Sequence, residues 1–170
     1  MLKKWLRERG RCRTVRALDL TGGITVEPGL DRYVEQAVQA FAAPVALVSL
    51  IHDDEQRVVA SRGFAPACLP REQGFCNHAL DCDAVLEVCD PLHDARFSDL
   101  PAVTGEPRIR YYLGAPLHLA GGIDVGVLCV LDTRERPPAS PDQRAYLQAL
   151  ARQVSMLLEQ RLAATGSLAA

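Results

Sequence analysis

Hydrophobic residues recur at helical spacing in three parts of the chain. Between residues 30 and 42, and between residues 140 and 162, they repeat every three or four positions, which predicts two helices with one apolar stripe each. Ser140 and Gln143 precede the second stripe with the spacing of a capping box, so we place the start of that helix there. Residues 2–18 predict a less regular helix, interrupted at Gly10.

Two pairs of hydrophobic segments have the length of strands. Residues 45–51 are separated from a strand at 56–61 by a polar turn, which predicts a hairpin. Residues 111–119 and 125–131 flank Gly121–Gly122 and predict a second hairpin. These runs are far shorter than the roughly 20 apolar residues of a membrane span, so no transmembrane helix is predicted.

Residues 62–110 form a long insert between the hairpins and are divided by several prolines. Inside it we predict a helix around 75–80, a strand around 85–89 and a short helix around 95–100. Its large hydrophobic residues indicate that it packs on the domain, and a long irregular segment that packs is typical of a functional loop. The order of helix, hairpin, insert, hairpin and helix predicts an α+β fold. Terminal helices then cover one face of an antiparallel sheet, and the insert covers the other.

Length and composition are those of one globular domain, with 170 residues, 48% hydrophobic and 24% charged. The net charge of −2 hides an asymmetry, because residues 1–16 carry seven Lys or Arg and one Glu, whereas the rest carries 12 bases and 20 acids. A basic arm could contact nucleic acid or a membrane. The acidic remainder offers no second basic patch, so we interpret the arm as the solvated face of a helix. The expected apolar side of that helix consists of Leu2, Trp5, Leu6, Val15 and Leu18.

The N-terminus lacks the apolar core of a secretory signal, which predicts a cytoplasmic location and reduced cysteines. Reactive side chains are densest in the insert, which contains Cys76, His78, Cys82, Cys89 and His93. Their spacing does not match that of zinc ligands, so no metal site is predicted. Residues two apart on a helix do not face each other, so Cys76 and His78 do not form a nucleophile and its base. No catalytic residue is predicted.

The last helix is longer than one small sheet needs. Its apolar positions Leu147, Leu150, Val154 and Leu157 have heptad-like spacing. The stripe could pair with a second copy of the chain, or it could pack against the chain's own N-terminal helix. Both alternatives stay open at the level of the sequence.

Five segments in order carry a resemblance to a known family. They are VALVSLIHDDEQRVVASRGF, REQGFCNHAL, CDPLHDARFSDLPAVTGEPRIRYYLGAPL, GVLCVLD and SPDQRAYLQALARQV. Together they resemble the GAF domain family over about residues 28–162, most of all the bacterial sensory type that precedes histidine kinases and diguanylate cyclases. The resemblance implies a sheet of about six strands, terminal helices on one face that also form dimers, and a small-molecule pocket on the other. It divides the chain into a basic arm at 1–27, the domain at 28–162 and a tail at 163–170.

The resemblance therefore predicts a stand-alone sensory or regulatory module that is dimeric and not an enzyme. Its ligand and any cofactor are unknown, its output would pass to a separate effector such as a kinase or cyclase, and no nucleic acid or membrane partner is expected. Arg110 would pair with an anion and the aromatic residues would form walls, unless the aromatic residues simply fill the core. The expected ligand-binding residues are Phe75, Cys76, His78, Asp90, Phe97, Arg110 and Tyr112. Deleting residues 1–16 is expected to leave the fold intact.

The alternative function is a thiol-dependent reductase of the free methionine-R-sulfoxide type. Cys76 lies where the resemblance places one of that enzyme's cysteines, with Cys82 or Cys89 as the resolving thiol. The segment Arg108–Tyr112 lacks the further thiol that the resemblance implies, which argues against this activity. The same cysteines could instead form a redox switch without turnover. Cys129 lies in the apolar run of a strand and is expected in the core.

Overall fold

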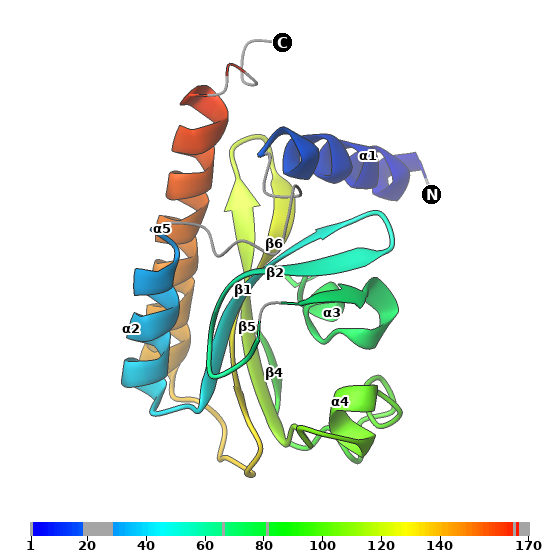
Figure 1. The fold of residues 1–170 in the computed structure, drawn as a ribbon, viewed down its shortest axis with the longest axis vertical. Coiled ribbons are helices and arrows are strands. Elements are labelled where there is room, and N and C mark those ends of the chain that lie inside the picture. Colours follow the sequence, from blue (N-terminus) through cyan, green and yellow to red (C-terminus); the bar gives the residue numbers. More distant parts are fainter. Residues whose placement is uncertain (1, 19–28, 66, 81, 165, 167–170) are drawn as a thin grey trace.

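The computed structural model describes residues 2–18, 29–65, 67–80, 82–164 and 166. Six strands form one sheet in the order β3-β2-β1-β6-β5-β4, and each neighbouring pair is antiparallel. The helices α2 and α5 cover one face, and the insert with α3 and α4 lies on the other (Figure 1). The predicted α+β architecture is confirmed. The elements are α1 (Leu2–Ala17), α2 (Asp31–Phe41), β1 (Val45–His52), β2 (Glu55–Arg62), β3 (Cys68–Pro70), a 3₁₀ turn (Arg71–Gln73), α3 (Cys76–Ala79), β4 (Leu86–Val88), α4 (Pro101–Thr104), β5 (Tyr111–Leu119), β6 (Ile123–Asp132) and α5 (Pro141–Ala164).

The sheet is buried on both faces, which explains its continuous apolar runs. Every position of β1 is buried, and its side chains alternate between two hydrophobic clusters. Val48 and Leu50 face α2 and α5, whereas Leu47 and Ile51 face the insert. The insert is therefore held on the sheet by a hydrophobic core of its own.

The long helix α5 begins as predicted. The backbone N–H of Gln143 donates to Ser140 Oγ at 3.2 Å, and the N–H of Ser140 donates to Gln143 Oε1 at 2.9 Å, which completes the capping box. Its apolar stripe, which includes Leu147 and Val154, is buried mainly against β5, with further contacts to β6 and α2. The stripe packs on the sheet, as predicted for a terminal helix that covers one of its faces. The far end of α5 approaches the end of α1 where Arg161 Nε donates to the carbonyl oxygen of Leu18 at 3.1 Å.

The sequence prediction was wrong at three places. The helix α1 runs through Gly10, whose bare Cα faces the Ile123 side chain. The short strand β3 was missed because three residues at the sheet edge carry no apolar alternation. The helix expected at 95–100 is a turn, and the helix α4 instead begins at Pro101, because proline suits the first helical position and keeps Leu100 extended.

The basic helix α1 lies across one end of the sheet and contacts β1 and β6 (Figure 1). Val15 and Leu18 are buried, as predicted, but Trp5 and Leu6 are 52% and 54% exposed. The side chain of Leu2 lies outside those that the structure describes. Arg11 is also buried, and its Nε donates to the carbonyl oxygen of Asp124 at 2.6 Å. None of the helices in the described part of the chain is both long and apolar enough to cross a membrane.

Ionic contacts also connect α1 to the rest of the domain. Arg71 Nη1 lies 2.5 Å from Glu8 Oε1, and Arg16 Nη2 lies 2.6 Å from Asp53 Oδ2. Glu8 also pairs with Arg11. The arm is therefore packed against the sheet through both apolar and charged side chains.

Deletion of residues 2–16 is consequently expected to destabilise the domain, in contrast to the expectation from sequence. Loss of the buried Val15 alone removes about 1.5–3 kcal/mol of hydrophobic stabilisation. In addition, Arg71 loses its ion pair with Glu8, and Asp53 loses its ion pair with Arg16. Urea unfolding measures the difference. The exposed Arg13→Ala is the control and should change the free energy of unfolding by less than about 0.5 kcal/mol. Equal stability of the deleted and complete chains would show that α1 is dispensable for folding.

Candidate functional site

Three of the predicted aromatic residues form one stack beneath the insert. The Phe75 ring lies 4.8 Å from that of Phe97 and 5.0 Å from that of Tyr112, with interplanar angles of 11° and 15°. All three side chains are buried. The His78 ring meets Phe97 edge-on at 4.9 Å. The stack is part of the hydrophobic core between the insert and the sheet.

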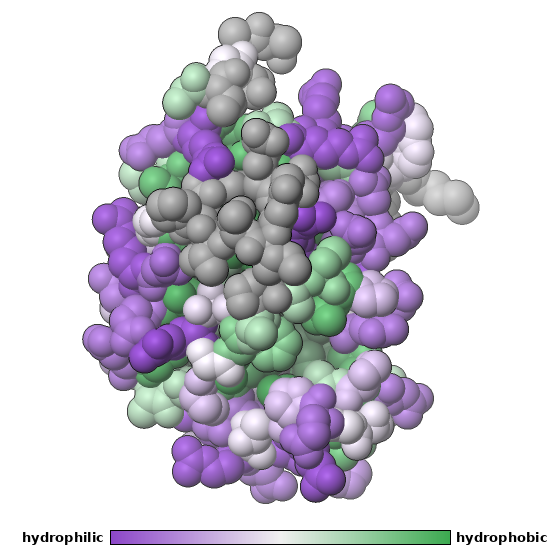
Figure 2. Space-filling view, in the orientation of Figure 1, coloured by the Kyte–Doolittle hydropathy of each residue, from purple (hydrophilic) through white to green (hydrophobic). Residues whose placement is uncertain are grey.

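A cavity of about 100 Å³ remains beside this stack. By this measure a site for one water needs roughly 10–15 Å³, so the cavity has room for several waters or one small organic molecule. In Figure 2, hydrophobic side chains gather near the middle of the face shown, and hydrophilic ones surround them. The cavity is lined by Val45, Leu47, Gln56, Val58, Gly63, Phe64, Leu69, Gln73, Gly74, Phe75, Cys76, Ala102, Pro107, Ile109, Tyr112, Cys129 and Leu131.

Phe75, Cys76 and Tyr112 are thus the predicted site residues that line the cavity, whereas the other four do not. Phe97 lies behind the stack, and His78 contacts its edge. Asp90 is exposed, and His93 Nδ1 lies 2.8 Å from its Oδ2. Arg110 Nη1 donates to the carbonyl oxygens of Val103 at 3.1 Å and Ile109 at 2.9 Å. Its guanidinium therefore holds the end of α4 instead of facing the cavity as an anion partner.

One polar group of the cavity was missed by sequence reasoning. Gln56 in β2 is buried, and its Oε1 has no hydrogen-bond partner among the described residues. Gly74 makes room for this amide, because a Cβ at position 74 would lie 1.9 Å from Gln56 Oε1. A buried carbonyl oxygen without a partner costs about 1–3 kcal/mol, so this acceptor is a natural anchor for a ligand that donates a hydrogen bond. An isolated glutamine in a strand gave no sequence signal of this role.

A pair of thiols forms the inner end of the cavity. Cys76 Sγ lies 3.8 Å from Cys129 Sγ, and the Tyr112 hydroxyl donates to Cys76 Sγ at 3.4 Å. Hydrogen bonding to the Cys129 thiol, assisted by Tyr112, lowers the pKa of Cys76 below its ordinary value despite burial, whereas burial raises the pKa of Cys129. The core position predicted for Cys129 is confirmed.

Cys76 contacts Cys129, and not Cys82 or Cys89, which were the expected resolving thiols. Cys89 packs in the hydrophobic cluster on the opposite face of the sheet, and burial raises the pKa of its thiol. Cys82 Sγ instead donates to the carbonyl oxygen of His78 at 3.6 Å. Among the described residues, no group of three or more His, Cys, Asp or Glu side chains could hold a metal ion.

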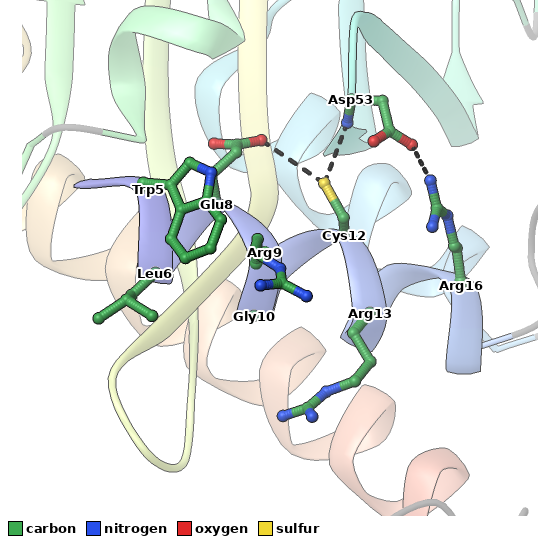
Figure 3. Close-up of a pocket in the computed structure, with 9 residues that line it drawn as sticks. All are labelled: Trp5, Leu6, Glu8, Arg9, Gly10, Cys12, Arg13, Arg16 and Asp53. Atoms are coloured by element: carbon green, nitrogen blue, oxygen red, sulfur yellow. Dashed lines mark hydrogen bonds and ion pairs between the residues drawn. The ribbon is translucent and has the colours of Figure 1, made fainter. Parts of the chain in front are cut away.

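A second, larger hollow of about 720 Å³ runs along α1 (Figure 3). Several charged groups line it, and two of them form an ion pair with each other. Arg16 pairs with Asp53, whose pKa is lowered to about 2 by hydrogen bonds from His52 and Arg16, and the Arg9 guanidinium lies 4.6 Å from the centre of the Trp5 ring. This hollow is an open groove beside one helix, and none of the predicted site residues lines it.

Comparison with known proteins identifies the family of the chain. The model of the GAF domain matches residues 26–158. The chain belongs to the GAF domain family. A cyclic di-GMP phosphodiesterase of Pseudomonas aeruginosa is 41% identical over 133 residues, which cover 76% of this chain and 23% of that protein. The chain thus spans about a quarter of this curated relative.

Solved GAF structures share the fold at low sequence identity. The GAF domain of an Acinetobacter phosphoenolpyruvate-protein phosphotransferase has a TM-score of 0.67 at 17% identity, and covers 95% of this chain and 98% of that one. The type II free methionine-R-sulfoxide reductase of Thermoplasma acidophilum has a TM-score of 0.63 at 11% identity, and covers 77% and 90%. The resemblance and the fold predicted from the sequence are confirmed. GAF domains are generally signalling domains that bind small molecules.

Proposed function

We propose that this GAF domain is a non-enzymatic sensor that binds a small neutral molecule in the cavity between the sheet and the insert. The unpaired Gln56 Oε1 carries the proposal, because it is a buried acceptor on a side chain that lines a mainly apolar cavity. The ligand class that fits has an N–H or O–H donor and only a few heavy atoms. The ligand would contact Phe75, Cys76 and Tyr112. The conformation of the insert would depend on the other four predicted site residues, which are His78, Asp90, Phe97 and Arg110.

Pyrazole and N-methylpyrazole are suitable matched probes, because only the former carries an N–H donor. In amide NMR titrations of the full chain, pyrazole is expected to shift the signals of Gly74 and Leu69, and N-methylpyrazole to bind more weakly. The variant Gln56→Leu should weaken pyrazole binding by about tenfold, since one net hydrogen bond is lost. The exposed Gln160→Leu is the matched control. Equal binding of both probes, or no shift with either, would contradict a ligand site at Gln56.

We further propose that the output concerns cyclic di-GMP and passes to a separate effector. The curated relative is named a cyclic di-GMP phosphodiesterase, and the part that this chain matches is a minor fraction of its length. Deleting the gene in its host should change the cellular cyclic di-GMP concentration, measured by mass spectrometry. The wild-type gene should restore the concentration and Gln56→Leu should not. An unchanged concentration would oppose this output.

A dimer is proposed through the outer face of α5. Tyr146 and Met156 are 42% and 58% exposed there, whereas the apolar stripe of the same helix is buried. A second copy of the chain would cover them. Native mass spectrometry should find a dimer for the wild type and for Leu92→Glu, which changes an exposed hydrophobic residue away from α5, and a monomer for Met156→Glu. A dimeric Met156→Glu variant would exclude this face as the interface.

A further inference from the structure

We propose that Cys76 and Cys129 are a peroxide-oxidised pair whose disulfide connects α3 to the centre of the sheet. This modification site lies in the same cavity as the proposed ligand site at Gln56, but formation of the disulfide does not depend on a ligand. The two sulfur atoms are already in contact at 3.8 Å, and their residues are 53 positions apart in the sequence. A disulfide needs an S–S distance of about 2.05 Å, so rotation of the two side chains has to close the remaining gap.

A glycine and a tyrosine beside the pair determine the environment of the Cys76 sulfur atom. Gly114 lies opposite Cys129 in the sheet, and a Cβ at position 114 would lie 2.2 Å from the Tyr112 hydroxyl oxygen. The absence of a side chain at Gly114 therefore lets Tyr112 reach Cys76 Sγ, to which it donates a hydrogen bond. Donors around a sulfur atom favour its thiolate form, which is the nucleophile. Cys76 is thus the attacking residue, and Cys129 resolves.

The cavity controls which oxidant reaches the pair. Both cysteines line it, and so do the exposed residues Gly63 and Gln73, so it extends from the surface to the buried thiols. A volume of about 100 Å³ admits hydrogen peroxide, which has two heavy atoms, but excludes a tripeptide disulfide such as oxidised glutathione. The pair is therefore expected to respond to hydrogen peroxide and to ignore the glutathione pool.

The oxidation proceeds in two balanced steps. The Cys76 thiolate attacks one oxygen of hydrogen peroxide, an S–O bond forms, the O–O bond breaks, and the departing hydroxide takes the proton released by the Cys76 thiol to give water. Cys129 then loses its proton and attacks the sulfur of the Cys76 sulfenic acid, an S–S bond forms, and the S–O bond breaks. The second hydroxide combines with the proton of Cys129. Two thiols and one peroxide thus become one disulfide and two waters, and a dithiol reductant reverses the change.

Closure would fix the insert on the sheet. Cys76 lies in α3, which belongs to the insert, and Cys129 lies in β6, which is a central strand of the sheet. A disulfide across a loop of this length should raise the melting temperature by on the order of 5–10 °C. The oxidised domain would hold its cavity wall rigid, and the reduced domain would let the insert move.

Peptide mass spectrometry of the purified full chain tests the proposal without any variant. Reduced protein is treated with a small excess of hydrogen peroxide, blocked with N-ethylmaleimide under denaturing conditions and digested. A cross-linked peptide pair containing Cys76 and Cys129 is expected, and oxidised glutathione should form it at least tenfold more slowly. Alkylation of both Cys76 and Cys129 after the peroxide treatment, or a disulfide found only between other cysteines, would overturn the proposal. Equal rates with both oxidants would overturn entry through the cavity.

Variants then separate the two roles. Cys129→Ser should stop at the sulfenic acid of Cys76, which dimedone traps, and Cys76→Ser should give neither product. The exposed Cys68→Ser is the matched control and should form the disulfide at the wild-type rate. Tyr112→Phe should slow the first step. Dimedone labelling at Cys129 in Cys76→Ser, with none at Cys76 in Cys129→Ser, would reverse the assignment of nucleophile and resolving thiol.

Discussion

Phe97→Ala is expected to lower the free energy of unfolding by about 3–5 kcal/mol, because it removes a fully buried ring from the stack that holds the insert on the sheet. Both Phe75 and His78 lose a ring contact in the same change. Equilibrium unfolding in urea, followed by far-UV circular dichroism, measures the loss. Phe64→Ala is the control for removing an aromatic ring, and a smaller loss is expected because Phe64 is only half-buried at the cavity.

The same variant also tests how the stack limits the cavity. Removing the Phe97 ring leaves an apolar void, and voids of this kind bind benzene. Benzene should therefore raise the melting temperature of Phe97→Ala by more than that of the wild type. A loss of stability below about 1 kcal/mol, with no benzene effect, would show that the insert collapses into the space and that Phe97 does not hold it in place.

Glu87→Ala is the second change with a large expected effect. Glu87 Oε1 accepts hydrogen bonds from the Tyr111 hydroxyl at 2.8 Å and from the backbone N–H of Ala139 at 2.6 Å, and its Oε2 pairs with Arg144. The Glu87 side chain is only 8% exposed. One carboxylate thus links β4, β5 and the start of α5. Its loss leaves two buried donors unpaired, the Tyr111 hydroxyl and the Ala139 N–H, which should cost about 2–5 kcal/mol.

Urea unfolding of Glu87→Ala and Glu87→Gln measures this network. Glutamine keeps an acceptor oxygen and should lose less stability than alanine. Glu106→Ala is the control, because its ion pair with Arg108 is largely exposed and should contribute less than about 1 kcal/mol. If Glu87→Ala were as stable as Glu106→Ala, water would have to satisfy the donors that Glu87 holds. Double-mutant cycles with Tyr111→Phe would then locate the remaining coupling.

The elements of the fold were mostly predictable, because each depends on residues close together in the chain. The capping box at Ser140 and Gln143 and the two hairpins follow from local patterns, and the structure confirms them. The misplacement of α4 had a local cause too, since the significance of Pro101 as a first helical residue was overlooked. The short edge strand β3 carries no pattern that a sequence could reveal.

The candidate site was predicted less well, because its contacts are distant in sequence. Cys76 and Tyr112 were expected at the cavity, and they do line it, but Arg110 turns its guanidinium to the backbone near α4. Gln56 was not considered, because a polar residue in a strand is ordinary until its oxygen is found buried and unpaired. The sequence left open which element the surplus length of α5 contacts, whereas the packing of its apolar stripe on the sheet was predicted and is observed.

The amino-acid sequence by itself determined the family, the order of helices and strands, and the two-faced burial of the sheet, because apolar periodicity and turn residues act over a few positions. Only the tertiary structure decided which side chains meet. It brought Cys76 to Cys129, placed Gly114 beneath the Tyr112 hydroxyl, and set the size of the cavity. These contacts depend on strand register and on how the insert packs over the sheet, and neither is written in the spacing of residues along the chain.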